Sequence, residues 1–171
     1  MTDMATAIIN SAERRIRIGG FNGFSFREIA AEVGVKSSSV HYYFPTKEKL
    51  AAEVIRRYTG KVAKLIDEAS ANGAEPTKVW TRAFRSTVQS KNHMCPAAVL
   101  AAGAMDLPSE VAVEVKAFFK MCLDKLVAAG VAKKGAAAFL STITGALVLA
   151  NALGDPDIYG RATKDLERMS S

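Results

Sequence analysis

Residues 25–50 read SFREIAAEVGVKSSSVHYYFPTKEKL, and they predict two short helices joined by a glycine turn, followed by the start of a third helix. Ser25 and Glu28 form a capping box: the serine hydroxyl accepts from the Glu28 amide, and the carboxylate reaches back to the Ser25 amide. Gly34 ends the first short helix, because glycine adopts the left-handed conformation that follows a helix. Helices this short are unstable alone, so the helix-turn-helix must pack on its neighbours.

The second short helix is predicted to run from the serines at 37–39 to about Phe44. A lysine side chain cannot cap a helix, so we expect Ser37, and not Lys36, to be the N-cap. Pro45 ends this helix because it lacks a backbone N–H, and a threonine directly after it is expected to cap the next helix.

Helical periodicity continues along the rest of the chain, and nothing in it reads as a strand. We therefore predict an all-α fold of about nine helices, with an N-terminal three-helix helix-turn-helix domain at residues 1–46 and a helical body at residues 47–171. Beyond the first three helices, the predicted helices are Lys47–Ala71, Thr77–Lys91, Pro96–Met105, Pro108–Ala129, Lys134–Leu153 and Ile158–Met169.

Composition and charge narrow the setting in which the chain works. The net charge of +6 and the pI of about 9.4 favour an anionic partner such as nucleic acid. No signal peptide is expected, because the short N-terminal apolar stretch is followed at once by Glu13 and three arginines. No stretch has the character of a membrane span, and the longest uncharged run, 135–154, reads as a buried or interface helix. We therefore expect a cytoplasmic protein whose Cys95 and Cys122 are thiols.

The outward face of the second short helix carries serine hydroxyls, two tyrosines and a histidine, with no acid among them. Such a face can enter the major groove of DNA, donate to phosphates and press its rings on thymine methyls. Lys47 begins the next helix, where the helix dipole and the free amides already favour a phosphate. Polar connectors with capping serines are common, so Ser37–Ser39 alone do not decide for DNA. The whole ordered set does.

This segment resembles the TetR/AcrR family of bacterial repressors over residues 5–50. The resemblance rests on Gly20-Phe21, on Ser25 with the run Arg27-Glu28-Ile29-Ala30, on Gly34-Val35, and on Tyr42-Tyr43-Phe44-Pro45-Thr46-Lys47-Glu48 with Leu50. It implies a sequence-specific DNA-binding transcriptional regulator, a repressor that a small-molecule effector releases from double-stranded operator DNA. Lys36 and His41 stand where the family often has serine and tyrosine, so the operator sequence does not carry over. By position, the implied DNA contacts are Ser25, Arg27, Lys36, Ser37, Ser39, His41, Tyr42, Tyr43 and Lys47.

The middle and the end of the chain resemble one subgroup of the same family. Cys95, Leu100-Ala101-Ala102, Leu107-Pro108 and the stretch 145–156 carry this resemblance, although Pro96 and Gly103 stand where leucine and glutamate are usual. The family implies an effector pocket in the helical body, and its candidate lining residues are Trp80, Phe84, Met94, Cys95, Met105, Phe118, Met121 and Cys122. It also implies a homodimer through the last two helices, with contacts from Phe139, Ile143, Ala146, Leu147 and Ala150. Both sets also match an ordinary helical core.

Other function classes fit the sequence less well. An enzyme is disfavoured, because the sequence shows no catalytic set, glycine-rich phosphate loop or cofactor motif, and His93 with Cys95 is too small a ligand set for zinc. A helical protein-binding module without specific DNA recognition stays open, and operator discrimination separates it from a regulator. Cys95, at the predicted start of a helix, is a candidate reactive thiol, and the alternative is a small buried hydrophobe.

Overall fold

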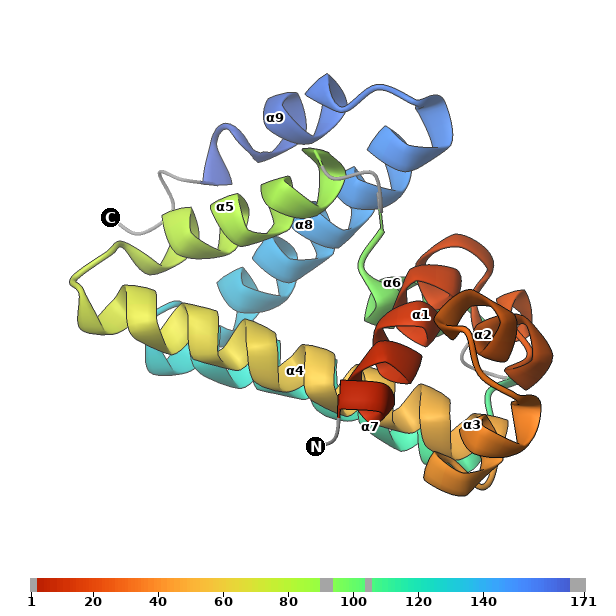
Figure 1. The fold of residues 1–171 in the computed structure, drawn as a ribbon. Helices are drawn as coiled ribbons and strands as arrows, with labels where there is room; N and C mark the ends of the chain where they lie inside the picture. The colour runs from red at the N-terminus through yellow and green to blue at the C-terminus, as the bar shows by residue number, and fades with distance from the viewer. Residues whose placement is uncertain (1–2, 90–93, 104–105, 167–171) are drawn as a thin grey trace. The chain divides into compact units, whose positions relative to one another are not determined.

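The computed structural model describes residues 3–89, 94–103 and 106–166, and every regular element in these ranges is a helix. The predicted all-α class is confirmed, and the described residues form nine α-helices and one short 3-10 helix (Figure 1). The elements are α1 (Asp3–Gly19), η1 (Phe21–Gly23), α2 (Phe26–Val33), α3 (Ser37–Tyr43), α4 (Lys47–Ala71), α5 (Pro76–Gln89), α6 (Pro96–Ala102), α7 (Ser109–Ala128), α8 (Lys133–Leu153) and α9 (Asp157–Thr163).

The helix positions follow the sequence closely, and the largest difference is at the end of the chain. α4 has the predicted bounds, and α5, α7 and α8 start within one residue of theirs. α9 ends at Thr163, well before the predicted end. The predicted ends at Lys91, Met105 and Met169 lie outside the described residues.

The chain divides into two compact units, unit 1 with residues 1–58 and 96–118, and unit 2 with residues 59–95 and 119–171. Both α4 and α7 run across this division, so the backbone of each helix belongs partly to each unit. The first turns of α4 therefore pack with the helix-turn-helix. The functional division at residues 46 and 47 remains a prediction.

In unit 1, the capping chemistry at the start of α2 is as the sequence predicts. Ser25 has extended backbone angles, and its hydroxyl accepts from the Glu28 amide at 3.3 Å. Gly34 ends α2 with a φ of 75°, which is the left-handed conformation that favours glycine. The buried isoleucines Ile8 and Ile16 of α1 and Ile29 of α2 belong to the core of this unit. The cap and the glycine thus fix both ends of a helix whose inner face is apolar.

The start of α3 differs from the expectation. Lys36, and not Ser37, occupies the N-cap position: its backbone is extended, and its carbonyl accepts from the Ser39 amide at 2.9 Å. No side chain caps this end. The expectation was wrong because it assumed that a side-chain cap is needed, whereas a backbone turn suffices here. The Thr46 cap of α4 is confirmed, since its hydroxyl accepts from the Lys49 amide at 3.2 Å.

In unit 2, α8 packs on α5 and α9 through one apolar stripe. The joint between α5 and α9 also has a buried polar contact, in which the Tyr159 hydroxyl donates to the Thr81 carbonyl at 3.0 Å. Both residues are fully buried, so this hydrogen bond satisfies a phenol that would otherwise be costly to bury.

By length and composition alone, α8 is long and apolar enough to cross a membrane, with a mean hydropathy of 1.7 in its most apolar window. By this criterion of length and hydropathy, the expectation that no stretch has the character of a membrane span is not confirmed. One such helix is weak evidence, because a core helix passes the same test. α8 buries one apolar stripe against α5 and α9, and 39% of its most apolar window is buried.

Candidate nucleic-acid interface

The helix-turn-helix buries one residue of α3 and leaves the others half-buried or exposed. Val40 is the one buried residue of this helix, and it anchors the helix to the core of unit 1. The turn before α3 is held by backbone bonds from Gly34 and Val35 to the Ala30 carbonyl. The exposed side chains of α3, those of Ser38, His41 and Tyr42, are accessible to a partner.

The outward side chains of α3 are hydroxyls and rings. Tyr42 is 82% exposed, and its ring meets that of Tyr43 edge to face, with 5.2 Å between the centroids. His41 packs edge to face against Phe26, with 4.5 Å between the centroids. A shallow hollow of about 420 Å³ lies beside α3 and is lined by Met4, Val35, Ser38, Ser39, Tyr42 and Tyr43.

Lys47 at the start of α4 has an environment that the sequence did not reveal. Its ammonium nitrogen lies 4.7 Å from the ring centroid of Phe21 and 4.8 Å from that of Phe24. Ring faces attract a cation, by about 0.5–1 kcal/mol at exposed sites. The two rings therefore restrict the position of the ammonium group. A lone lysine at a helix start would instead sample many rotamers.

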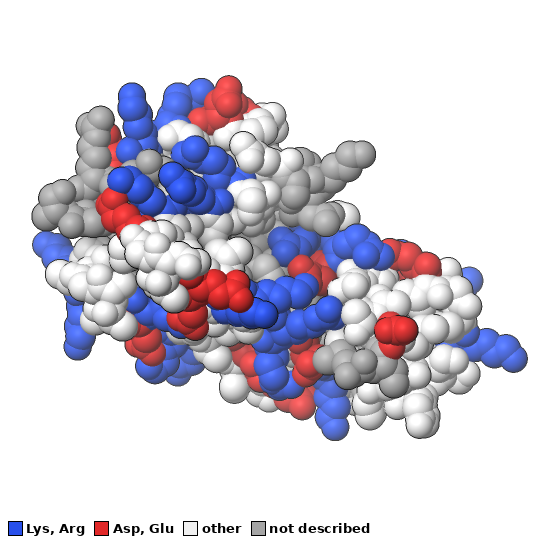
Figure 2. Space-filling view, turned by 60° about the vertical axis from the view of Figure 1, so that its left-hand side comes forward, with Lys and Arg blue, Asp and Glu red and all other residues white. Residues whose placement is uncertain are grey.

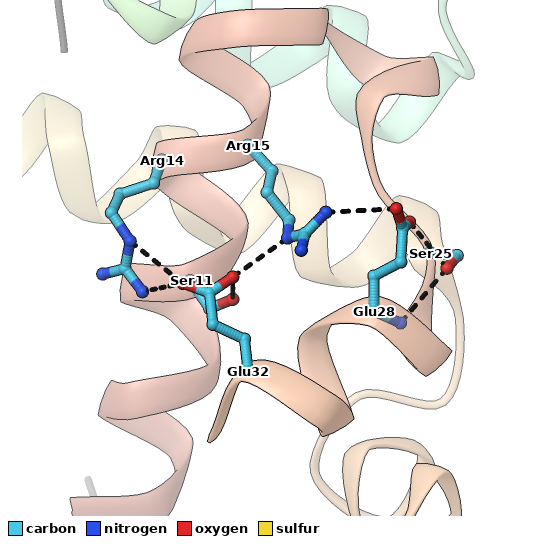
Figure 3. A network of polar contacts seen from close by, with 6 residues as sticks. All are labelled: Ser11, Arg14, Arg15, Ser25, Glu28 and Glu32. Carbon is cyan, nitrogen blue, oxygen red and sulfur yellow. Dashed lines mark hydrogen bonds and ion pairs between the residues drawn. The ribbon is translucent and has the colours of Figure 1, made fainter. Parts of the chain in front are cut away.

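A charged network joins α1 to α2 (Figure 3). The Glu32 carboxylate accepts from the Ser11 hydroxyl at 2.9 Å, from Arg15 Nε at 3.0 Å and from the Arg14 guanidinium. Hydrogen bonding to Arg14 is the main reason that the pKa of Glu32 is lowered from its usual 4.5 to about 2. Arg15 also reaches the Glu28 carboxylate, at 3.2 Å. The network ties the second helix of the motif to the first.

The same network engages a predicted DNA contact. The Ser25 hydroxyl donates to Glu28 Oε2 at 2.8 Å while it accepts from the Glu28 amide. This hydrogen bond is the main reason that the pKa of Glu28 is lowered. Sequence reasoning missed the network, although two acids four residues apart on α2 and two adjacent arginines on α1 were the available signal.

All nine predicted DNA contacts lie in unit 1, in the N-cap of α2, the first turn of α2, α3 with its N-cap, or the first residue of α4, and none of them is buried. The wider surface is mixed in charge: Figure 2 shows acidic side chains interspersed among the lysines and arginines of the visible face. Contact with DNA remains a prediction for each of the nine.

The described members of the predicted effector set are divided between the two units. In unit 2, Trp80 and Phe84 stack with 6.1 Å between the ring centroids. Phe118 belongs to unit 1, where its ring lies 5.4 Å from that of Tyr58. Met105 lies outside the described residues. Met121 is half-buried, and the buried members of the set are Trp80, Phe84, Met94, Cys95, Phe118 and Cys122.

Both cysteines are buried thiols, as expected for their redox state. Burial raises the pKa of Cys122, and the neighbouring Cys95 raises it further. Cys95 is 0% exposed, although it directly precedes α6. A reagent therefore has no route to its sulfur in this conformation, which favours the buried-hydrophobe alternative over the reactive thiol.

The five predicted dimer contacts lie inside the protomer. Phe139, Ile143, Ala146, Leu147 and Ala150 are between 0% and 3% exposed, on the face that α8 turns towards the core of unit 2. The protomer itself covers them in this structure, and their contact with a second subunit remains a prediction. The periodicity identified a buried stripe correctly but could not tell which partner covers it. The large apolar side chains that α8 exposes are Val148, Leu149 and Leu153.

Within the described ranges, no group of three or more His, Cys, Asp or Glu side chains is placed to hold a metal ion. The features that remain are an exposed polar helix after a glycine turn, a lysine held at the next helix start, and a helical second unit. Together they define the class of helix-turn-helix proteins with an all-helical partner unit.

Comparisons with known proteins agree with this class. The family described as "Bacterial regulatory proteins, tetR family" matches residues 8–54. An uncharacterised HTH-type transcriptional regulator of Bacillus subtilis (strain 168), YxaF, is 30% identical over 78 residues. That match covers 44% of this chain and 40% of the Bacillus protein.

Solved structures extend the likeness over nearly the whole chain. A TetR-family transcriptional regulator from Agrobacterium tumefaciens is 29% identical with a TM-score of 0.91, and one from Legionella pneumophila is 26% identical with a TM-score of 0.87. Each alignment covers 98% of this chain and 97% of the other. The family model thus matches the helix-turn-helix region, and the whole chain is similar to TetR-family transcriptional regulators, so the resemblance stated above from residues 5–50 is confirmed.

Proposed function

We propose that this protein is a cytoplasmic repressor that binds one operator sequence as a homodimer and leaves it when a small molecule binds. The observation that carries the proposal is α3, which buries Val40 alone and turns hydroxyls and rings outward without an acidic side chain. Sequence is read by hydrogen bonds and apolar contacts at base edges, and this helix supplies both.

Phosphate contacts position such a helix on the duplex. Arg27 is exposed in the first turn of α2, and Lys47 begins α4, so basic side chains flank α3 on both sides along the chain. Half or more of the hydrogen bonds in protein–DNA complexes go to the backbone and fix the register of the protein. These two residues are proposed to do so here.

A homodimer follows from the way DNA presents successive major grooves. Two recognition helices placed one turn of DNA apart need a twofold protein. The proposed contact is the outer surface of α8, where Val148, Leu149 and Leu153 are 47%, 53% and 67% exposed. Exposed apolar side chains on one helix stretch are stabilised when a second copy covers them.

Release by an effector requires a structural element that connects the effector-binding part of the chain to the DNA-binding part. α4 begins at Lys47 in unit 1 and ends at Ala71 in unit 2, so a tilt of this helix changes the position of α3. A ligand drives the tilt only if it binds one position of α4 more tightly than the other.

The proposal is tested by measuring binding of the purified protein to the DNA just upstream of its own gene and to a scrambled duplex, at two salt concentrations. We expect a preference of about a thousandfold or more, and an affinity that falls steeply with salt. If both duplexes bind equally weakly, selection from a pool of random duplexes tests for an operator located elsewhere. If no sequence is enriched from that pool either, the proposal is contradicted, and a protein-binding module becomes the better interpretation.

A further inference from the structure

A groove between α4 and α5 is lined by none of the eight residues that the sequence suggested for an effector. It measures about 550 Å³, and all of its lining belongs to unit 2. Volumes of about 300–1,000 Å³ are typical of small-molecule sites. The two helices meet there in a tight hairpin (Figure 1). The lining residues are Leu65, Ala69, Ala74, Glu75, Lys78, Val79, Arg82, Ala83 and Ser86.

The floor of the groove is apolar. Leu65 from α4 faces Val79 and Ala83 of α5 across it. Leu65 is 48% exposed, whereas the other large apolar side chains reported for α4 lie in the core, among them Leu50 and Ile55. A half-exposed leucine in a hollow is stabilised by an apolar ligand that covers it, by about 25 cal/mol for each Å² of apolar surface removed from water.

The rim of the groove is basic. Lys78 pairs with Glu75 at 2.5 Å, while Arg82 makes no ion pair with any residue in the described part of the chain. Two cations and one acid leave the lining with a net charge of +1. Lys78 and Arg82 are four residues apart, so both point to the same side of α5. An unpaired guanidinium above an apolar floor matches a single carboxylate on an apolar body.

We propose that this groove binds an amphiphilic monoanion, a carboxylate with an aliphatic or aromatic body, and that this ligand is the effector. Arg82 binds the carboxylate as a charge-assisted pair, and Leu65 with Val79 covers the body. A partner protein is a poorer match, because a stable protein interface buries about 1,200–2,000 Å² in total, more than a hollow of this size offers. The role of this ligand as an effector rests on the proposed function, whereas the binding of the ligand in the groove does not depend on it.

The test is calorimetric titration of the full-length protein, without DNA, with sodium decanoate and with naphthoate. Trp80, the single tryptophan, follows the groove residue Val79 and reports binding by its fluorescence. We expect one carboxylate per chain, about tenfold tighter than decanol, with no binding of decyltrimethylammonium. Arg82→Gln and Leu65→Asn are each expected to weaken decanoate binding about tenfold or more.

Lys64→Gln is the matched control, because Lys64 is an exposed lysine next to Leu65 that does not line the groove. The proposal is overturned if neither carboxylate binds, if decanol binds as tightly as decanoate, or if Arg82→Gln and Leu65→Asn bind like the Lys64→Gln control. Operator affinity is measured separately with and without decanoate. If decanoate binds through Arg82 but operator affinity stays unchanged, the binding site is supported, and the claim that this ligand releases the protein from DNA is contradicted.

Discussion

Charged side chains join α1 to α2 in unit 1, whereas an apolar stripe and neutral hydrogen bonds join α5, α8 and α9 in unit 2. In the first joint, Glu32 collects bonds from Ser11, Arg14 and Arg15. In the second, Phe139 of α8 is 1% exposed and Tyr159 donates to a backbone carbonyl. From this difference we expect pH and salt to act on the joint between α1 and α2, and changes in packing volume to act on the joint of α5, α8 and α9.

The largest expected effect concerns access to the interior of unit 2. Cys95 and Cys122 are expected to react with a thiol reagent at neutral pH about a thousandfold more slowly in the folded protein than in denaturant, because reaction needs an opening of the core. Mass spectrometry of timed samples measures both sites. Fast labelling of Cys95 alone in the folded protein would contradict the claim that the core excludes the reagent, and would support Cys95 as a reactive thiol.

Core truncation tests the packing of unit 2 directly. Phe139→Ala is expected to lower the free energy of unfolding by about 3–5 kcal/mol, because it leaves a cavity where the ring packed. Urea denaturation of the wild type and the variant measures it. Val113→Ala is the control, since Val113 is 64% exposed and its loss should cost about 0.5 kcal/mol or less. If both variants lose a similar free energy of unfolding, the claim that close packing around Phe139 stabilises unit 2 is contradicted.

The charged joint of unit 1 is tested by pH. The pKa of Glu32 is lowered in the folded protein, so its stabilisation is fully present above the usual 4.5 and is lost as the pH falls towards 2. Its side chain is 31% exposed, so screening by solvent limits the cost of Glu32→Gln at neutral pH to about 1 kcal/mol. Urea denaturation between pH 7 and pH 3 should show a smaller loss in the variant than in the wild type.

The control for this measurement is Glu68→Gln, because the Glu68 side chain is 65% exposed and pairs loosely with Lys64 at 3.7 Å. We expect it to keep the pH dependence of the wild type. If Glu32→Gln and Glu68→Gln show the same pH dependence, the network does not stabilise the joint between α1 and α2.

The smallest expected effect concerns Lys47. Lys47→Met keeps an apolar chain on Phe21 and Phe24 but removes the charge, so binding to operator and scrambled DNA should weaken alike, and the slope of log affinity against log salt should fall by about 1. Titrations over several salt concentrations measure the slope, with Lys64→Met as the control. An unchanged slope would mean that the Lys47 ammonium contacts the rings of Phe21 and Phe24 but no DNA phosphate.

The local chemistry of the motif could be predicted from the sequence, and contacts across long sequence separations could not. Ser25, Gly34 and Thr46 act where their residue types indicate, because caps and turns depend on neighbours a few positions away. Glu32 and Lys47 needed the structure, since their partners lie 17 to 26 residues away. The fold class was predictable for the same reason as the caps: helical periodicity is local.

The dimer and effector residues show the limit of periodicity. A stripe such as Phe139, Ile143 and Leu147 states that a face is covered but not whether the same chain covers it. Methionine and aromatic residues likewise favour the interior without indicating a cavity. The groove between α4 and α5 is lined by apolar, small and charged side chains, a mixture that no composition rule selects.

The most direct test of the central claim is the ratio of operator affinity to scrambled-DNA affinity for the wild type and for Tyr42→Ala. Tyr42 is 82% exposed on α3, so its removal should leave the stability of the fold unchanged. If α3 reads base edges, the ratio falls about tenfold or more while scrambled-DNA affinity changes little. A ratio that stays at the wild-type value in Tyr42→Ala, and also in His41→Ala and Ser39→Ala, would contradict the claim that α3 recognises the operator.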